Sequence, residues 1–369
     1  MNIPFMRLDR QFEQNKDEIL TLCEQVFSHG RVLQGPEVES LEHHLSIVMN
    51  ARYAVAVGSG TDALFFTLIA AGMKPGDRVA VPAMTFIATA SPILRAGGTP
   101  VFVDAGNDYQ PDITHTIHLV ETGLVNIVVT AHLYGQLFDI TPLADACQSN
   151  DVLLIEDAAQ AIGSTLNGSK PASQSNAAIV SFDPMKIAGA FGSGGAVITN
   201  NPDIATRVKR LRYHGRDESR AYQELGYNSQ IASIQAAIVK FKLDHLKEWT
   251  KKRQQIAQQY TTALEKIPDM TAPRELPGSN HVFHKYVLNS GPERNCLREH
   301  LALAGIETMI HYPSSLNKEP IFSKYVEPES SFPEAERISK EALSLPIYPE
   351  LTNAEVNYVC ESITNFNTK

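Results

Sequence analysis

The chain has 369 residues, and 43% of them are apolar, which is enough for a large buried core and suggests two domains. Its formal charge of -9 at pH 7 gives no long-range attraction to nucleic acid or anionic membranes, so we expect neither as a partner. No stretch approaches the roughly 18 apolar residues of a membrane span, and the first residues, Met1 to Pro4, lack a signal-peptide pattern. We therefore predict a cytoplasmic protein.

The N-terminal segment, residues 2–35, is predicted to be an arm that packs across both domains. Its helical pattern covers residues 9–27, and this helix could equally be the first helix of the large domain. From residue 41 to about residue 246, short apolar runs alternate with helical patterns. Such a pattern predicts an α/β domain with a mostly parallel, seven-stranded sheet that helices cover on both faces. The seven runs are 54–57, 79–81, 100–103, 127–130, 152–155, 178–182 and 196–199.

The C-terminal part has a different pattern, which begins near residue 247. A charged helix over residues 248–264 is followed by a proline-rich loop over residues 267–277 and then by short strand and helix patterns. We predict a smaller α+β domain here. The chain is therefore divided into residues 1–246, the arm and the large domain, and residues 247–369, the small domain.

The cysteines and most histidines carry no pattern of a metal site. The four cysteines lie far apart without a Cys-x-x-Cys pair, so we expect reduced structural thiols. His43 and His44 fall in an exposed helical pattern, and His281 and His284 fall in a strand pattern, so we expect structural or surface roles for them. No metal is predicted. The cysteines are Cys23, Cys147, Cys296 and Cys360.

The run that ends at Val57 leads through Gly58 and Gly60 into an apolar helix. Free backbone N–H groups and the dipole at a helix start attract anions, so Gly60, Thr61 and Asp62 are candidates for binding a phosphate. We expect the Asp62 carboxylate to cap the first turn while its backbone N–H still donates. Taken alone, a Gly-Ser-Gly turn is more often an ordinary loop, and this one is neither a dinucleotide fingerprint nor a P-loop.

A second candidate, Asp157, follows the run over residues 152–155. On a parallel sheet, ligands bind beyond the carboxyl ends of the strands, which is where this side chain is predicted to project. A carboxylate there can pair with a protonated pyridine nitrogen, although an Asp after a strand is also a common helix cap. Gln160 lies one turn further on the same face, from which it can hydrogen-bond a ring substituent.

The third candidate is Lys186, five residues after Ser181 at the end of another run and just before four glycines that end at Gly195. A lysine that forms a Schiff base must be partly desolvated, and flexible backbone must bend around it. A lysine in a glycine-rich loop is usually only solvated. What favours the catalytic interpretation is the ensemble: an anion loop, a strand-end Asp, and a strand-end Ser and Lys, in this order on one parallel sheet.

These residues belong to a longer set of motifs that resembles the DegT/DnrJ/EryC1/StrS family of sugar aminotransferases over nearly the whole chain. The resemblance implies fold type I, the aspartate aminotransferase superfamily, with pyridoxal phosphate (PLP) as cofactor. The motifs are Gly58-Ser-Gly-Thr-Asp-Ala-Leu, Met84-Thr-Phe86-Ile-Ala-Thr, Leu133-Tyr-Gly135, Ile155-Glu-Asp157-Ala-Ala-Gln160, Ser181-Phe-x-x-x-Lys186, Gly194-Gly-x-x-x-Thr-Asn, Gly226-Tyr-Asn228 through Gln235-Ala-Ala, Ile310-His-Tyr-Pro313 and Leu343-Ser-Leu-Pro346.

The family's roles can be carried over where the motifs match. Lys186 resembles the Schiff-base lysine, Asp157 the partner of the pyridine nitrogen, and Gln160 the neighbour of the ring hydroxyl. Phe86 resembles the aromatic side chain that stacks on the ring, with an ordinary core aromatic as the alternative. The phosphate binders are matched by Gly60, Thr61, Asp62 and Ser181, together with Asn228 from a second subunit, which implies a homodimer with shared active sites.

Other positions concern the substrate. Gln230 stands where the family often has Arg, which argues against a uronic acid as substrate, while His311 and Tyr312 resemble a motif that contacts the substrate. Two further departures are Asp183, at a position that is commonly aromatic, and Leu288-Asn289, where a strand often ends in Arg. Relatives with His at the lysine position perform deoxygenation or dehydration, so Lys186 favours transamination.

We therefore predict a PLP-dependent aminotransferase that moves an amino group from glutamate to a keto group of a dTDP- or UDP-linked keto-deoxy-hexose. The segments 30–36 and 343–346 resemble relatives that act at C3, with C4 as the alternative. Such a reaction belongs to amino-sugar biosynthesis for lipopolysaccharide O-antigen, another surface polysaccharide or a glycosylated metabolite. The rivals are a PLP-dependent sugar dehydratase and a regulator or binding module that no longer turns over.

Overall fold

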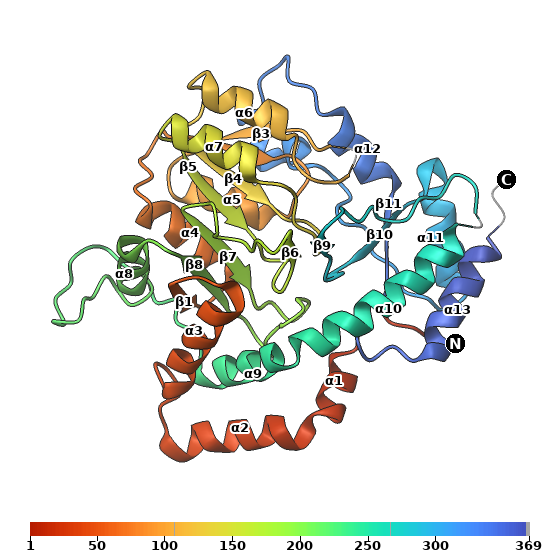
Figure 1. Cartoon of the computed structure of the whole chain (residues 1–369), viewed down its shortest axis with the longest axis horizontal. Helices are drawn as coiled ribbons and strands as arrows, with labels where there is room; N and C mark the ends of the chain where they lie inside the picture. Colours follow the sequence, from red (N-terminus) through yellow and green to blue (C-terminus); the bar gives the residue numbers. More distant parts are fainter. Residues whose placement is uncertain (107, 266, 367–369) are drawn as a thin grey trace.

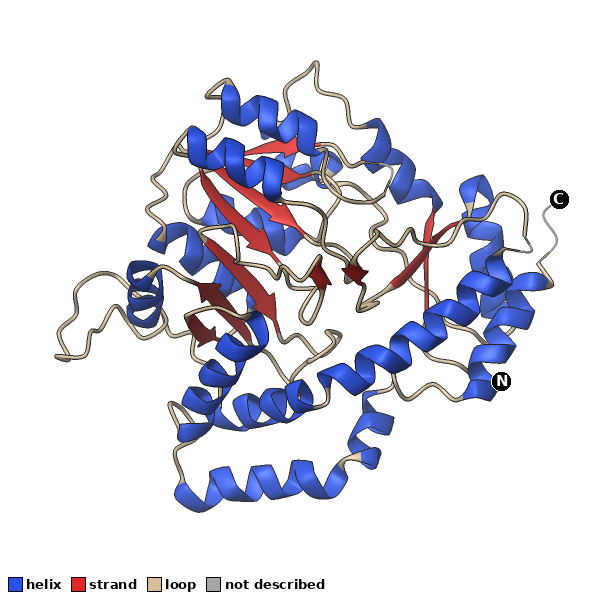
Figure 2. Cartoon of the chain, viewed as in Figure 1, coloured by secondary structure: helices blue, strands red, loops and turns tan. Residues whose placement is uncertain are grey.

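The computed structural model describes residues 1–106, 108–265 and 267–366, and its centre is a seven-stranded sheet (Figures 1 and 2). The strand order is β1-β8-β7-β5-β4-β2-β3, and β8 alone among these strands runs antiparallel to its neighbours. The predicted α/β fold with a mostly parallel sheet is thereby confirmed, with every strand within two residues of its expected bounds. The strands are β1 (Tyr53–Val57), β2 (Arg78–Pro82), β3 (Thr99–Val103), β4 (Ile127–Ala131), β5 (Leu153–Asp157), β7 (Ala177–Ser181) and β8 (Gly195–Thr199).

Helices cover both faces of this sheet because its strands are apolar on both sides. Along β1, Val55 and Val57 join the core on one face, while the smaller Ala54 and Ala56 join the core on the other. Alanines let helices α3 and α9 approach the second face closely. The surrounding helices are α3 (Pro36–Met49), α4 (Gly60–Ala70), α5 (Ile87–Arg95), α6 (Ile113–Glu121), α7 (Thr141–Ser149), α8 (Pro202–Leu211) and α9 (Ser233–Asp244).

The single helix predicted over residues 9–27 is in fact two helices, α1 (Leu8–Gln14) and α2 (Lys16–His29). Asn15 separates them: its backbone leaves the helical region, and its side-chain amide donates to the carbonyl of Gln11. Asparagine readily makes such local bonds to the backbone, which compete with helix propagation. Helix α2 then runs beside α9, below the sheet in Figure 1.

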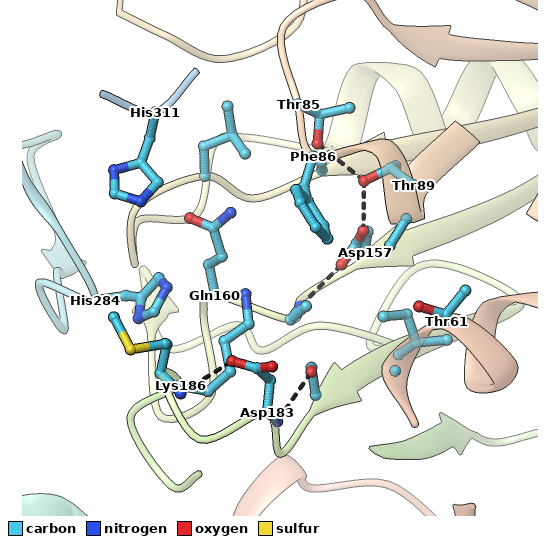
Figure 3. A pocket seen from close by; sticks show the side chains of 18 of the residues that line it. Thr61, Thr85, Phe86, Thr89, Asp157, Gln160, Asp183, Lys186, His284 and His311 are labelled. Atoms are coloured by element: carbon cyan, nitrogen blue, oxygen red, sulfur yellow. Dashed lines mark hydrogen bonds between the residues drawn. The ribbon is translucent and has the colours of Figure 1, made fainter. Parts of the chain in front are cut away.

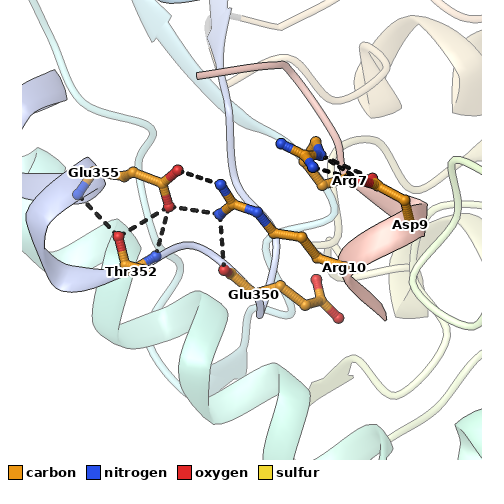
Figure 4. Close-up of polar contacts among 6 residues, drawn as sticks. All are labelled: Arg7, Asp9, Arg10, Glu350, Thr352 and Glu355. Carbon is orange, nitrogen blue, oxygen red and sulfur yellow. Dashed lines mark hydrogen bonds and ion pairs between the residues drawn. The ribbon is translucent and has the colours of Figure 1, made fainter. Parts of the chain in front are cut away.

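Both ends of the N-terminal segment contact distant parts of the chain. Ile3 forms a parallel β-bridge with Ile306, and Leu33 forms an antiparallel bridge with Ala232. From α1, Arg10 reaches helix α13 (Asn353–Thr364), where its guanidinium binds both carboxylate oxygens of Glu355 at 2.6 and 2.7 Å (Figure 4). Glu355 also closes a capping box with Thr352, so one carboxylate joins α1 to the start of α13.

The C-terminal part of the chain packs around a core of its own. The long helix α10 (Leu246–Leu264) lies against α13 and buries Tyr260 beside Tyr286 of a two-stranded sheet. The division at residue 246 stays a prediction, and residues 266 and 367–369 of that range lie outside the described residues. The remaining elements are β6 (Thr165–Leu166), β9 (Ser279–Asn280), β10 (Tyr286–Asn289), β11 (Ala342–Leu345), α11 (Arg294–Leu303), α12 (Pro333–Glu341) and the 3-10 helices Gly291–Glu293, Leu316–Lys318 and Pro320–Tyr325.

The strand predicted around His281 and His284 does not form. Both histidines lie in irregular backbone between β9 and β10, because Phe283 has a φ of 45°, which no strand accommodates. The imidazole of His281 also accepts from the Phe283 N–H at 2.9 Å, and this local bond takes the place of a sheet bond. Within residues 1–106, 108–265 and 267–366, no helix is long and apolar enough to cross a membrane.

We expect Glu355→Ala to lower the free energy of unfolding by about 1 to 3 kcal/mol, because Arg10 then loses a bidentate partner in a largely buried position. The hydrogen bonds from Arg10 lower the pKa of Glu355 to about 2. A lowered pKa adds stability at neutral pH, and that stability is lost as the pH falls towards 2. The difference between wild type and variant in urea unfolding should therefore shrink on acidification. The exposed Glu361→Ala on the same helix is the control, and equal losses in both variants would contradict this account.

Candidate active site

A cavity of about 330 Å³ lies at the carboxyl ends of the parallel strands, where the predicted site residues meet. Its wall comes from the start of α4, the segment after β2, the ends of β5 and β7, and two segments of the C-terminal part (Figure 3). Three predicted site residues, Asp62, Asn228 and Gln230, do not line it. Those that do are Gly60, Thr61, Phe86, Asp157, Gln160, Ser181, Lys186, His311 and Tyr312.

Asp157 is the last residue of β5, and both of its carboxylate oxygens are held in place. The Thr89 hydroxyl donates to Oδ2 at 2.7 Å, and the Ala159 N–H donates to Oδ1 at 3.0 Å. Thr89 in turn lies 2.9 Å from the hydroxyl of Thr85, and both threonines are buried. Figure 3 shows this chain of hydroxyls leading from α5 to the carboxylate. The aspartate is therefore fixed rather than mobile, as a group that must aim at one atom of a ligand requires.

Gln160 connects two other walls of the cavity. Its side-chain oxygen accepts from the Tyr134 N–H at 2.8 Å, and its amide donates to the Tyr312 hydroxyl at 3.1 Å. The Tyr312 ring lies 5.8 Å from the ring of Phe86, whose side chain is 50% exposed. A half-exposed aromatic residue at a cavity mouth is available for a planar ligand. The alternative expectation for Phe86, an ordinary core aromatic, does not fit this exposure.

The start of α4 presents backbone donors to the cavity, but Asp62 does not cap the helix as we expected. Ser59 is the cap, and its hydroxyl accepts the N–H of Asp62 at 3.1 Å. Serine in extended backbone is well suited to this position. The N–H groups of Gly60 and Thr61 belong to the first turn, where a helix offers them no acceptor of its own. A Cβ on Gly60 would lie 2.8 Å from Cβ of Ser181, so glycine allows this close approach.

The carboxylate of Asp62 turns away from the cavity to join other elements. Its Oδ1 accepts from Arg95 at 2.7 Å, and its Oδ2 accepts from the Ser229 hydroxyl at 2.7 Å. Arg95 also lies over the ring of Phe65, with its guanidinium carbon 3.9 Å from the ring centroid. The aspartate therefore neutralises an arginine and positions the loop that follows Asn228, which explains its distance from the anion site.

Lys186 lies in the turn after β7, and Asp183 shapes that turn. The Asp183 carboxylate accepts from the Met185 N–H at 2.9 Å, and its backbone carbonyl accepts from the Lys186 N–H at 2.8 Å. Such a turn is the usual role of an aspartate in a loop, and it accounts for this departure from an aromatic residue. Burial lowers the pKa of Lys186, while the carboxylates of Asp157 and Asp183 oppose this effect. At neutral pH a larger fraction of Lys186 is therefore the neutral amine than in an exposed lysine, and only the neutral amine can accept a proton.

Several lining residues were not assigned to the site from the sequence, among them Thr85, Thr89, His284 and Lys285. Thr85 lies just before α5 and Thr89 lies in its first turn, and both belong to the motif that begins at Met84. His284 and Lys285 gave no signal, because only the tertiary fold brings the segment before β10 to this cavity. Burial lowers the pKa of His284, and the nearby Lys285 lowers it further, so this imidazole is neutral at pH 7.

Asn228 and Gln230 lie together outside the cavity, in the loop between α8 and α9. The Gln230 amide donates to the Asn228 oxygen at 3.4 Å and meets the side chain of Gln34 from the N-terminal segment. The same loop, which extends from the body of the molecule beside α8 in Figure 1, carries Tyr222 and Leu225, which are 73% and 91% exposed. Within the described part of the chain, no group of three or more His, Cys, Asp or Glu side chains could hold a metal ion.

The sheet order and the lysine–aspartate pair at one strand edge define the class: a fold-type I aminotransferase. A model of the DegT/DnrJ/EryC1/StrS aminotransferase family matches residues 13–364. The chain therefore belongs to the DegT/DnrJ/EryC1/StrS aminotransferase family, and the predictions of family, fold and enzyme class are confirmed.

Several curated proteins are similar to the chain over almost its full length. It is 39% identical to a "Pleiotropic regulatory protein" of Geobacillus stearothermophilus, with 99% of both chains covered. It is 33% identical to the "dTDP-3-amino-3,4,6-trideoxy-alpha-D-glucose transaminase" of Streptomyces venezuelae, covering 98% of this chain and 95% of the other. It is 30% identical to the "3-oxo-glucose-6-phosphate:glutamate aminotransferase" of Bacillus subtilis, covering 98% of this chain and 83% of the other.

Two solved structures match the fold closely. DesV of S. venezuelae, described as "in complex with ketimine intermediate", superposes with a TM-score of 0.93 at 33% identity and covers 98% of both chains. NtdA of Bacillus subtilis, described "with bound cofactor pmp", superposes with a TM-score of 0.90 at 29% identity and covers 98% of this chain and 84% of the other. The expectation of a pyridoxal cofactor is confirmed at the level of the family.

We expect Thr89→Val to lower the rate of amino transfer about tenfold, because Asp157 then keeps one of its two donors and a hydrogen bond to a charged group contributes roughly 1.5 kcal/mol. Folding should change little, since valine has nearly the same shape. The matched control is Thr67→Val, another fully buried threonine, on the face of α4 away from the cavity. Melting temperatures and transamination rates of both variants check this. A rate for Thr89→Val equal to that of the control would contradict it.

Proposed function

We propose that the chain is a PLP-dependent aminotransferase that moves an amino group from glutamate to a keto carbon of a nucleotide-linked deoxy-hexose. The observation that carries this proposal is the meeting of Lys186, Asp157 and Gln160 in one cavity, beside the free N–H groups of α4. We assign Lys186 as the lysine that bonds to the cofactor, and Asp157 as the partner of its ring nitrogen. These assignments rest on the family motifs and on the geometry of the cavity.

The residues present fit the cofactor. Phe86 offers an exposed ring face, Asp157 offers an oriented carboxylate, and the first turn of α4 with Thr61 and Ser181 offers donors for a phosphate. Gln160 is close enough to the same space to bond a ring hydroxyl. The Asp62 N–H, which we had counted among the phosphate donors, is bound to Ser59 instead. Gly60, Thr61 and Ser181 are therefore the phosphate binders that we retain within one subunit.

Each side chain of the cavity has a separate role in the proposed reaction. PLP supplies an electron sink when it is bound. Asp157 would hold the proton on the ring nitrogen, because both of its carboxylate oxygens are fixed in place. The amine of Lys186, with a pKa lowered by burial, accepts a proton from the α-carbon of the amino donor in the first half of the reaction. In the second half it donates a proton to the sugar carbon that receives the amino group. Tyr312 and Phe86 cover the cavity and keep water from the reacting carbon.

We propose C3 of a dTDP- or UDP-linked keto sugar as the position that receives the amino group. The support is the name of the S. venezuelae relative and the segments 30–36 and 343–346. His311 contributes its imidazole to the cavity wall, where Nδ1 lies 2.8 Å from the Ser344 hydroxyl, so we assign His311 and Tyr312 to the sugar. The reaction belongs to amino-sugar biosynthesis, for lipopolysaccharide or for a glycosylated metabolite, and its location in the cytoplasm stays a prediction.

The test measures the visible absorption of the bound cofactor. Protein loaded with PLP should absorb in the visible, the absorption should be missing in Lys186→Ala, and glutamate should bleach it in the wild type. A 3-keto nucleotide sugar should then restore the colour faster than its 4-keto isomer. Borohydride reduction of the loaded wild type followed by peptide mapping should find the cofactor on Lys186 and not on Lys285, the second lysine of the cavity.

Three outcomes would contradict parts of this proposal. Colour that no amino donor bleaches would exclude amino transfer and would leave a regulator, the role that the G. stearothermophilus relative's name suggests. Product formed from a sugar without consumption of a donor would indicate a dehydratase. Faster restoration of colour by the 4-keto isomer would move the reaction to C4.

We also propose a homodimer in which Asn228 of each subunit completes the active site of the other. Its support is the position of Asn228, exposed and outside the cavity of its own chain, in a loop with two exposed apolar side chains, Tyr222 and Leu225. Apolar groups of that size on a projecting loop are typical of a contact surface. Gln230 on this loop would then face the partner's sugar.

A mixture of two variants tests the shared site. Lys186→Ala and Asn228→Ala should each be impaired alone, but their hybrid dimer regains one intact site only if lysine and asparagine come from different subunits. Random mixing makes half of the dimers hybrid with one of two sites intact, so we expect about a quarter of wild-type activity. Activity that stays at the level of the separate variants would place Asn228 in its own subunit's site, and a monomer by ultracentrifugation would exclude sharing.

A further inference from the structure

A second lysine in the cavity, Lys285, has no role in the proposed mechanism. It lies just before β10, lines the cavity together with Lys186, and is 5% exposed. Its ammonium nitrogen lies 4.6 Å from the centroid of the Phe5 ring. Among the described residues, no carboxylate forms an ion pair with it within 4.0 Å. A buried amine without a carboxylate partner is costly to keep charged unless a ligand provides the anion.

The charges that face Lys285 leave this corner of the cavity positive. The pKa of Lys285 is lowered to about 7, mainly by burial and then by the charges of Lys186 and Arg253, while Asp183 opposes them. Arg253, from α10, donates from Nη1 to the carbonyls of Phe283 and Ile347 at 3.2 and 2.7 Å. Two nearby histidines are neutral and do not change the charge of this corner, since burial lowers the pKa of both His284 and His311. An anionic group is what this corner lacks.

The N-terminal segment holds the lysine in position. The Phe5 N–H donates to the carboxylate of Glu307 at 2.9 Å, and two residues earlier Ile3 is paired with Ile306. The Phe5 ring therefore lies at a fixed place, 5.8 Å from the His311 ring and within cation–π distance of the ammonium. An aromatic face lets Lys285 carry a charge before an anion arrives, without neutralising it as a carboxylate would.

We propose that the ammonium of Lys285 binds the carboxylate of the amino-acid donor and thereby selects donors with that group. This inference rests on the proposed function. The α-carboxylate of glutamate is one bond from the carbon that exchanges its proton with Lys186, so its binding group must share the cavity with Lys186, as Lys285 does. The sugar ring is the weaker candidate for this cation, because a keto-deoxy-hexose ring carries no carboxylate, and the sugar half of the reaction tests whether the diphosphate of its nucleotide uses Lys285 instead.

A lysine suits this position better than a permanently charged arginine. In a ping-pong reaction, one cavity takes an anionic amino acid in the first half and a sugar without that carboxylate in the second. A lysine with a pKa of about 7 can bind the carboxylate as a cation and then lose its proton at little cost when the carboxylate leaves. Lys285 thus adapts the same space to two substrates of different charge.

The experiment measures the two halves separately in PLP-loaded protein. We expect Lys285→Gln to lower kcat/KM for glutamate by at least about tenfold, because a desolvated charge pair is lost, while kcat/KM for the keto sugar changes less than about twofold. Lys285→Arg should retain much of the glutamate activity. An unreactive analogue, glutarate, gives a direct readout: its dissociation constant by calorimetry should rise in Lys285→Gln and not in Lys285→Arg.

The pH profile distinguishes binding of a carboxylate from a structural role. Since the cationic form binds, kcat/KM for glutamate in the wild type should fall as the pH rises through about 7, and Lys285→Arg should lack this fall. The groups that face Lys285, namely Lys186, Asp183, Arg253, His284 and His311, are unchanged in that variant. A variant that is only less stable would have a lower melting temperature, but its kcat/KM for glutamate would still fall through the same pH range as that of the wild type.

Each outcome decides the matter. Equal loss of kcat/KM for glutamate and sugar, or loss for the sugar alone, would overturn the assignment of Lys285 to the donor. Unchanged glutarate affinity in Lys285→Gln would overturn it as well, even if the protein catalyses no amino transfer at all. Conversely, wild-type colour that glutamate does not bleach would contradict the proposed function without bearing on the glutarate result.

Discussion

The active site depends on the pairing of β5 with β7. These strands are neighbours and parallel, with Asp157 opposite Ile179, so both end at the same edge of the sheet. Strand β5 therefore ends at Asp157, opposite Ile179 and two residues before the end of β7 at Ser181. The turn after β7 then brings Lys186 back to the same edge of the sheet. Thr89 and the Ala159 N–H both donate to the carboxylate of Asp157, whose position this pairing determines. A shift of one residue would turn Asp157 to the opposite face of the sheet.

This dependence explains why the sequence revealed much of the site. Continuous apolar runs such as residues 127–130 identify buried parallel strands, and the carboxyl ends of such strands are where ligands bind. Asp157 and Lys186 could be found in this way because they lie two and four residues after the runs that end at residues 155 and 182. Family motifs then supplied roles for Phe86 and Asn228, which no pattern of neighbouring residues would have indicated.

What could not be read from the sequence are contacts between segments distant along the chain. Lys285 and Phe5 are 280 positions apart in numbering, and nothing local to either residue indicates their meeting. The helix cap is a similar case, since serine and aspartate are both good cap residues. Ser59 takes this position because Arg95 and Ser229 bind the carboxylate of Asp62. The break at Asn15 was missed because the helical periodicity on both sides of it is uninterrupted.

The antiparallel strand β8 is the exception on this sheet, and it has a consequence for the evolution and engineering of the site. Because β8 runs against its neighbours, it begins where they end, and its first residue, Gly195, pairs with Val57 on one side and Ser181 on the other. A Cβ at that position would come within 2.5 Å of the Gly60 nitrogen. Substitutions at the exposed Met309, on the rim of the cavity, therefore disturb less structure than substitutions at Gly195, where a side chain would meet backbone.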